Sequence, residues 1–196
     1  MNVSDTDREK PHSAFYTGQL IAAMPGLSDP NFSGTLTLIC EHDENGAIGL
    51  VINQPMSITL TDVFKQMGIV ESPQLENDRV LCGGPVANDR GFVLHRLTGQ
   101  TWQSTLEITE DFGITTSQDI IEALAECRAP EGATLILGYA GWSEGQLEQE
   151  VMENTWLSLP SSDHVLFEAA FEDRLSTATN EAGINFSRLS MAAGRA

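Results

Sequence analysis

The stretch Gly138-Tyr-Ala-Gly-Trp-Ser-Glu-Gly-Gln-Leu-Glu-Gln-Glu150 is the segment around which we expect the fold to be organised. Residues 133–137 precede it with an apolar, partly β-branched run, which predicts a buried strand. Residues 146–152 follow it and are good helix formers. Ser143 with Gln146 three residues later fits a capping box, so we expect the helix to begin there. The predicted local structure is a strand, a sharp glycine-rich turn and a helix whose N-terminus faces the turn.

The composition predicts a folded and strongly acidic chain. Its 196 residues can bury a sizeable core and fit one domain. Ten basic residues stand against 28 acidic ones, which gives a formal net charge of -18. A chain this acidic is a poor non-specific binder of nucleic acid and is repelled by anionic membranes, since both carry negative charge. We therefore expect neither a direct nucleic-acid partner nor a membrane partner.

The cysteines and the N-terminus predict a cytoplasmic protein. Cys40, Cys82 and Cys127 lie far apart in apolar surroundings, which favours three reduced core thiols and a reducing compartment. The first ten residues are polar and do not resemble a signal peptide. No apolar run approaches the roughly 18 residues that a membrane helix needs. We expect residues 1–12 to be a disordered tail and residues 13–196 to form a single compact domain.

Several further elements have clear local signals. Residues 34–40 and 47–53 predict a hairpin around the pair Asn45-Gly46. Leu60, Val63, Phe64 and Met67 form an apolar helical stripe, with Thr59 or Thr61 as its cap and Gly68 at its end. Other strands are predicted at 15–23, 80–82, 92–94 and 104–109, and other helices around 120–124, capped by Thr116 or Ser117, and from about 171 to 182. Interspersed strands and helices together with a hairpin predict a mixed sheet.

Motifs along almost the whole chain, from about residue 14, identify a family resemblance. They are Gly18-Gln-Leu-Ile-Ala22, Glu41-His42, Gly49-Leu-Val-Ile-Asn53-Gln-Pro55, Gly83-Gly-Pro-Val86, Phe92-Val-Leu-His95, Gly138-Tyr-Ala-Gly-Trp142 and Gly145-Gln-Leu-Glu148. In this order they closely resemble the AlgH/YqgE family of small bacterial proteins. The resemblance implies an α+β fold, with a mixed sheet curled into a barrel-like core and helices packed around it. The family is named for a proposed role in transcriptional control of alginate synthesis, and its function is uncharacterised.

The segment Gly141-Trp-Ser143-Glu-Gly145 spells the G-x-S-x-G nucleophile elbow of α/β-hydrolases. A catalytic triad would need an acid and then a histidine downstream of the serine. Only His164 follows, with Asp163 directly beside it, and adjacent residues do not easily form a relay. Ser143 is explained equally well as a helix cap. We therefore predict no catalytic residue and keep a hydrolase as an alternative.

A second motif, Gly83-Gly84-Pro85, suggests an anion site. Consecutive glycines allow backbone amides to converge on an anion. Three of the ten basic residues lie around this turn within 18 positions, together with His95; they are Arg79, Arg90 and Arg96. The alternative interpretation is a tight turn whose arginines pair with the surplus of acidic residues.

We interpret the chain as a non-enzymatic binding or regulatory protein that acts through an unidentified protein or small-molecule ligand. Its working surface is expected to be a groove between the turns 83–86 and 141–148. The candidate ligand-binding residues are Gly83, Gly84, Pro85, Arg90, His95, Arg96, Trp142, Gln146 and Glu148. No cofactor is expected, and no metal-binding motif is present, although a metal site built from distant histidines such as His42 stays open. The alternatives are an enzyme that acts on a small anionic substrate, with Ser143 or His95 as its reactive group, and a direct DNA-binding regulator, which the net charge disfavours.

Overall fold

A computed structural model describes residues 15–71 and 79–186 of the chain. The strands in these two ranges are β1 (Leu20–Ala23), β2 (Leu36–Asp43), β3 (Gly46–Val51), β4 (Pro55–Thr59), β5 (Arg79–Cys82), β6 (Val86–Arg96), β7 (Thr105–Glu107), β8 (Phe112–Thr115), β9 (Thr134–Ser143) and β10 (Trp156–Leu159). The helices are α1 (Leu60–Met67), α2 (Gln118–Ala125), α3 (Gln146–Met152) and α4 (Arg174–Glu181), with a π-helical turn η1 (His164–Glu168) and a 3₁₀ turn η2 (Phe171–Asp173). The tail predicted at residues 1–12 lies outside the described residues.

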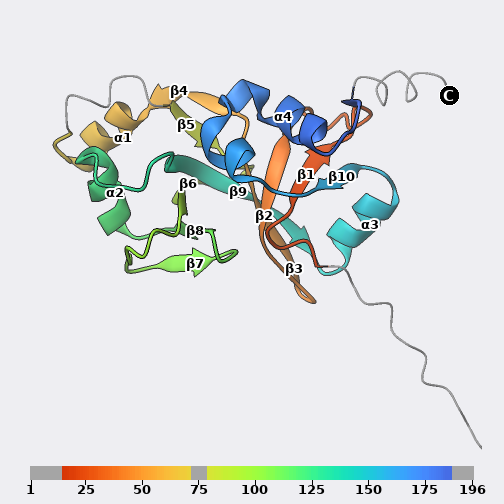
Figure 1. The fold of residues 1–196 in the computed structure, drawn as a ribbon, viewed down its shortest axis with the longest axis horizontal. Coiled ribbons are helices and arrows are strands. Elements are labelled where there is room, and N and C mark those ends of the chain that lie inside the picture. The colour runs from red at the N-terminus through yellow and green to blue at the C-terminus, as the bar shows by residue number, and fades with distance from the viewer. Residues whose placement is uncertain (1–14, 72–78, 187–196) are drawn as a thin grey trace, which may run out of the picture.

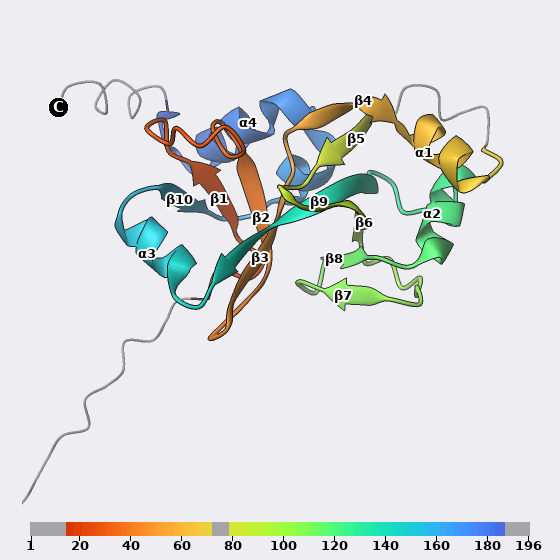
Figure 2. The same ribbon diagram turned by 180° about the vertical axis from the view of Figure 1, so that it is seen from behind.

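The strands form one mixed sheet that curls into a half-barrel, so the predicted α+β class is confirmed. Neighbouring strands follow the order β10-β1-β2-β3-β9-β6-β8-β7, while β5 pairs with β4 and runs parallel to β9. Figures 1 and 2 show α1 and α2 at one end of the molecule, α3 at the opposite end, and α4 beside the sheet between them. None of the helices in the described ranges is long and apolar enough to span a lipid bilayer.

Elements with strong local signals form where the sequence predicts them. The hairpin of β2 and β3 turns through Glu44 and Asn45, and Asp43 pairs with Gly46, the first residue of β3, across the turn. Helix α1 has Thr59 as its N-cap, and Thr59 and Asp62 make a reciprocal capping box. It ends at Gly68, whose φ of 70° is left-handed. These features depend on neighbouring residues alone, which is why the sequence identifies them.

The central prediction, a sharp turn directly after residue 137, is wrong. Strand β9 continues through Gly138 and Gly141 as far as Ser143, because β3 pairs with its second half. Helix α3 then begins at Gln146 with Gly145 as its N-cap. Only half of the predicted capping box is present, in which the backbone N–H of Ser143 donates to Oε1 of Gln146 over 3.0 Å.

Other boundaries also differ from the prediction. Strand β1 covers only the second half of the predicted range 15–23. Strand β3 ends at Val51, whereas the predicted strand ended at residue 53, and strand β4, which begins at Pro55, was not predicted. Strand β8 was not predicted, and β7 occupies three residues of the predicted range 104–109. Short strands of this kind are stabilised by their partners in the sheet, so their own residues carry little signal.

The three cysteines are free thiols but differ in exposure. Cys40 is buried, and burial raises the pKa of its thiol to about 12, so the prediction of a core thiol is confirmed. Cys82 is half-buried. Cys127 is exposed, and its prediction as a core thiol is wrong. Helix α2 ends at Ala125, and the chain reverses direction through a left-handed residue (φ 56°) at Cys127.

Strand β9 contributes to three separate hydrophobic clusters. Ile136 and Tyr139 pack in the main core with α4 and η1, while Leu135 packs with α1 and α2. Trp142 packs in a third cluster, beneath α3. Side chains alternate strictly along a regular strand, so Ile136 and Tyr139, three positions apart, would otherwise lie on opposite faces. Gly138 has a left-handed φ of 76° between them, and the register with β6 shifts there. This bulge returns Tyr139 to the inner face of the sheet.

The chain crosses β9 at a contact between glycines. The backbone N–H of Gly83 donates to Leu137 O over 2.7 Å, and Gly83 O accepts from the N–H of Val51 over 2.9 Å, so Gly83 links β9 to β3. A Cβ atom on Gly83 would lie 2.3 Å from Gly138 O, and one on Gly84 would lie 2.3 Å from the carbonyl carbon of Tyr139. These neighbours are backbone atoms, which cannot move aside as a flexible side chain can. The two glycine-rich motifs are therefore packed directly against each other.

We predict that alanine at this crossing destabilises the protein far more than alanine at glycines with open space around them, such as Gly34 and Gly26. Gly83→Ala should lower the free energy of unfolding by about 3 kcal/mol or more, because strands must separate to admit the methyl group. Gly34→Ala should cost only about 1–2 kcal/mol, since Gly34 has a left-handed φ of 72° but open space around it. Gly26→Ala should be nearly neutral, because Gly26 has neither constraint. Urea denaturation measures all three, and equal losses for Gly83→Ala and Gly34→Ala would contradict the steric argument.

Candidate functional site

The three arginines around the Gly83-Gly84-Pro85 turn lie in three different environments. Arg79 pairs with Glu172 at 2.7 Å on the surface. Arg90 lies over the ring of Phe92, with its guanidinium carbon 5.3 Å from the ring centroid. Arg96 belongs to a network of acidic groups at the end of β6. The structure therefore does not bring these side chains together around one anion.

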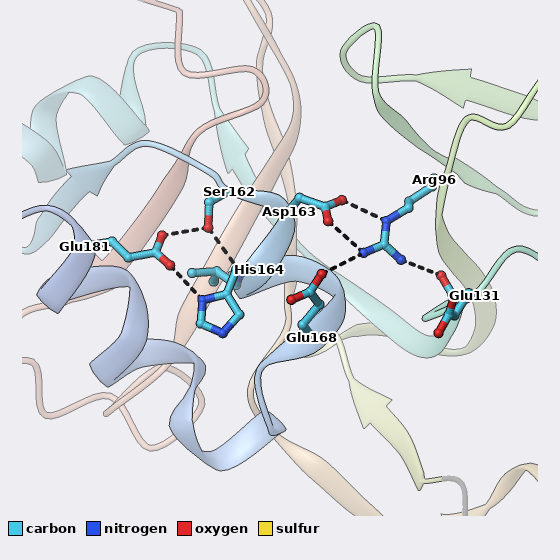
Figure 3. Close-up of polar contacts among 8 residues, drawn as sticks. Arg96, Glu131, Ser162, Asp163, His164, Glu168 and Glu181 are labelled. Carbon is cyan, nitrogen blue, oxygen red and sulfur yellow. Dashed lines mark hydrogen bonds and ion pairs between the residues drawn. The ribbon is translucent and has the colours of Figure 1, made fainter.

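Arg96 is fully occupied by protein partners (Figure 3). Its Nε and Nη2 donate to Oδ1 and Oδ2 of Asp163 over 2.8 and 2.7 Å, and its Nη1 donates to the carbonyl oxygen of Glu131 over 2.7 Å. Glu168 Oε1 lies 3.6 Å from Nη2. The paired guanidinium lowers the pKa of Asp163 through these hydrogen bonds. For Arg96 the structure therefore matches the alternative to an anion site, in which the arginines near the Gly83-Gly84-Pro85 turn pair with acidic residues of the protein.

The glycine turn itself lines a polar cavity of about 560 Å³. Gly84 and Pro85 contribute to its wall together with Gln54, Cys82 and Asn88. Gly83 is buried at the crossing with β9. No residue of the turn 141–148 lines this cavity, because that turn lies at the far end of β9. The two motifs adjoin through backbone packing, and the groove expected between the two turns is not among the cavities described here.

The residues of the turn 141–148 are held by a buried tryptophan pair. The indole N–H groups of Trp142 and Trp156 both donate to Oε2 of Glu150, over 2.9 and 2.7 Å. Gln146 donates to the other carboxylate oxygen, Oε1, over 2.9 Å. The rings of Trp142 and Trp156 are edge-to-face, with centroids 5.9 Å apart, and both are buried. Trp142 and Trp156 thus attach α3 to strands β9 and β10 through Glu150, and Gln146 binds the same carboxylate from within the helix. Glu150 is a central residue that the sequence did not indicate.

Glu148 approaches a buried histidine. His42 accepts the backbone N–H of Tyr16 at Nδ1 over 3.0 Å and stacks on the Tyr16 ring. Its proton therefore lies on Nε2, which is 3.2 Å from Oε1 of Glu148 without the alignment of a hydrogen bond. The side chain of His42 is fully buried, whereas that of Glu148 is 27% exposed. This pair joins β2 to α3 and explains the Glu41-His42 motif as packing.

His95 is fully buried and both of its ring nitrogens are occupied. Nδ1 lies 2.9 Å from Arg96 O and donates to it, while Nε2 accepts from the hydroxyl of Thr115 over 2.8 Å. Burial lowers the pKa of the imidazole below its ordinary value. His95 therefore serves as a neutral structural residue between β6 and β8.

The geometry of a hydrolase triad is not present in the described residues. Ser143 ends β9, and no hydrogen bond joins its hydroxyl to a histidine in residues 15–71 and 79–186. His164 pairs with Glu181 at 2.9 Å, whereas Asp163 pairs with Arg96, and Figure 3 shows the two side chains engaged on opposite sides. Within the same ranges no group of three or more His, Cys, Asp or Glu side chains is placed to hold a metal ion.

A small pocket lies on the inner face of the sheet, between the β2–β3 hairpin and the β7–β8 pair. We call it the inner-face pocket. It has a volume of about 290 Å³ and is lined by Cys40, Glu41, Ile48, Arg90, Phe92, Ser104, Thr105, Leu106, Ile114, Thr116 and Tyr139. Of the candidate site residues, only Arg90 lines it. Sequence reasoning missed the rest because they come from six different strands and their flanks.

We predict that Glu150→Ala destabilises the protein by about 2–4 kcal/mol, because two buried indole donors lose their acceptor. The tryptophan emission of the folded variant should shift to the red as water reaches α3. Glu153→Ala is the control, since Glu153 accepts only from exposed Gln149 and should change stability by less than about 0.5 kcal/mol. Similar losses for both variants would show that Glu150 has no special role.

We also predict a pH dependence that arises from His95. The unfolded chain binds a proton at the ordinary histidine pKa of 6.5, whereas burial lowers the pKa of folded His95 below it. The contribution of His95 to stability is therefore complete above about pH 6.5 and is lost as the pH falls below that value. Between about pH 7 and 5, the free energy of unfolding should fall more steeply in the parent chain than in His95→Gln. If the free energy of unfolding changes with pH equally steeply in the parent chain and in His95→Gln, this role of His95 is contradicted.

Related proteins occur in many bacteria. The AlgH-like family model (DUF179) matches residues 20–187. The UPF0301 protein of Saccharophagus degradans is 42% identical over 201 residues, which cover 99% of this chain and 98% of that protein. The UPF0301 protein of Xanthomonas campestris pv. campestris (strain B100) is 48% identical over 179 residues, which cover 91% of this chain and 95% of that protein.

Solved structures show the same fold. The solution structure of AlgH from Pseudomonas aeruginosa matches with a TM-score of 0.76 and 40% identity, over 100% of both chains. A crystal structure from Corynebacterium diphtheriae matches with a TM-score of 0.72 over 94% of both chains, but at 18% identity it supports the fold alone. The resemblance inferred from the motifs is thus confirmed, and the chain belongs to the AlgH-like UPF0301 family of uncharacterised bacterial proteins.

Proposed function

We propose that this chain is a non-enzymatic, cytoplasmic binding protein that holds a small organic acid in the inner-face pocket. The observation that carries the proposal is the position of Arg90. It lines the pocket, and none of the ion pairs among residues 15–71 and 79–186 includes it. In a chain with 28 acidic residues against ten basic ones, a cation without a carboxylate partner favours an anionic ligand. The free thiols of Cys40, Cys82 and Cys127 suit a reducing compartment.

The wall of the pocket favours an apolar or aromatic body on the ligand. Phe92 and Ile114 form buried parts of the wall, each only 5% exposed. Ile48 and Leu106 are 38% and 42% exposed, although large apolar side chains of a soluble protein are usually covered. A ligand between the β2–β3 hairpin and β7 would cover both. The volume of about 290 Å³ is near the lower limit for small-molecule sites, so the ligand is small.

The other polar groups of the inner-face pocket narrow the class of ligand further. Glu41 also lines the pocket, and its negative charge disfavours a ligand that carries several negative charges. The hydroxyls of Ser104 and Thr116, which are 3.1 Å apart, offer hydrogen bonds to a polar substituent. These groups together favour a monoanion, such as an aromatic or short aliphatic carboxylate with a hydrogen-bond donor that can face Glu41.

The test is a thermal-shift screen of small carboxylic acids on the full chain, followed by calorimetric titration of those that raise the Tm. Arg90→Gln should weaken binding of such an acid at least about tenfold, because a charge-assisted hydrogen bond contributes roughly 1.5–3 kcal/mol. Arg128→Gln is the matched control, since Arg128 is an exposed arginine paired with Glu126 and does not line the pocket. The proposal fails if no acid binds, or if Arg90→Gln binds the acid as tightly as the control does.

A further inference from the structure

A second cationic site lies away from the inner-face pocket, around Arg174 at the start of α4. The residue is only 2% exposed, and it is among the largest fully buried side chains of the protein. Its Nη1 donates to Ile52 O over 3.0 Å and its Nε to Ala169 O over 3.4 Å. Its guanidinium carbon lies 4.7 Å from the centroid of the Phe171 ring. All of these partners are neutral.

Within the part of the chain that the structure describes, no carboxylate neutralises Arg174. None of the ion pairs in residues 15–71 and 79–186 includes it, although the chain has 28 acidic residues. Burial lowers the pKa of the guanidinium to about 10, so the group keeps its positive charge at neutral pH. Buried charges are normally paired, because neutral carbonyls and an aromatic ring replace only part of the lost hydration. The buried cation therefore lacks a counter-ion within the described protein.

Arg174 borders an open cavity, which we call the arginine pocket. It has a volume of about 510 Å³, within the usual range for small-molecule sites, and it lies between the start of β9, the start of β5 and the η1–η2 segment. Arg79 and Glu172 stand on its rim, where they pair with each other at 2.7 Å. Both side chains are more than half exposed, at 53% and 59%. An exposed pair of this kind is weak, so Arg79 is free to exchange Glu172 for another anion.

We propose that the arginine pocket binds the phosphate group of a small phosphorylated molecule between Arg174 and Arg79. Guanidinium groups match the geometry of phosphate oxygens and bind them in pairs of parallel hydrogen bonds. The phosphate supplies the counter-charge that Arg174 lacks, and Arg79 closes over it after it leaves Glu172. The remaining volume, with Phe167 and Phe171 on its wall, accommodates the rest of the molecule. This site shares no lining residue with the inner-face pocket, so its test is independent of the test of the function proposed above.

The test uses inorganic phosphate and phenyl phosphate, titrated into the full chain at constant ionic strength with sodium chloride as the balancing salt. We expect a saturable rise in Tm and a saturable calorimetric signal with at least one of the two. Tighter binding of phenyl phosphate would identify a phosphate ester as the ligand, and equal binding would identify free phosphate. The absence of saturable binding for both anions overturns the proposal.

Two surface variants of the pocket and one control variant keep the test independent of folding. Arg79→Gln removes one binding cation and should weaken phosphate binding at least about tenfold, the loss of one charge-assisted contact. Glu172→Gln releases Arg79 from its competitor and should strengthen binding. Arg128→Gln removes a paired surface arginine outside the pocket and should leave binding unchanged. Equal affinities for Arg79→Gln, Glu172→Gln and Arg128→Gln would overturn the site, and would leave Arg174 as a tether between Ile52 and Ala169.

Discussion

The fold depends on the close backbone contact of Gly83 and Gly84 with Gly138 and Tyr139. Side chains at this crossing would come within 2.3 Å of backbone atoms, so only glycine allows strands β5 and β9 to meet as they do. The contact lets one strand, β9, pair with β3, β5 and β6. The bulge at Gly138 then directs the side chains of β9 into three clusters. The curl of the sheet, and with it the inner-face pocket, follows from this arrangement.

The most recognisable residues of the chain have structural roles. Trp142 donates to Glu150, and Glu148 approaches His42, so this part of the motif attaches α3 to the sheet. His95 satisfies its two nitrogens within the sheet. The G-x-S-x-G pattern therefore has a structural explanation here. Gly141 lies within strand β9, and Gly145 is the N-cap of α3 with a left-handed φ of 70°. A family signature identifies a fold without marking a reactive group.

The distribution of charge underlies both of the proposed binding sites. With a net charge of -18, most cations of the protein are expected to be paired, and Arg96 with Asp163 follows that rule. Arg90 and Arg174 have no carboxylate partner among the described residues, and each lines a cavity. Arg174 is the more constrained of the two, because it is buried and cannot be hydrated as an exposed side chain can. Both proposed sites therefore rest on arginines without a carboxylate partner, and neither rests on a glycine-rich motif.

The sequence by itself determined the α+β class, the family, the β2–β3 hairpin and the limits of α1, because caps, turns and apolar periodicity depend on residues close in the chain. It gave Arg90 as one candidate ligand-binding residue, which stays a prediction, and it grouped Arg90 with Arg79 and Arg96, whose side chains lie elsewhere in the fold. Only the tertiary structure decided that β9 runs through Gly138 and Gly141, since the pairing with β3 is non-local. It also decided that Arg174, more than 80 residues after the Gly83-Gly84-Pro85 turn, borders a cavity and has no carboxylate partner in the described ranges. The burial and the pairing of a side chain depend on which distant segments pack together, and local sequence patterns do not indicate this.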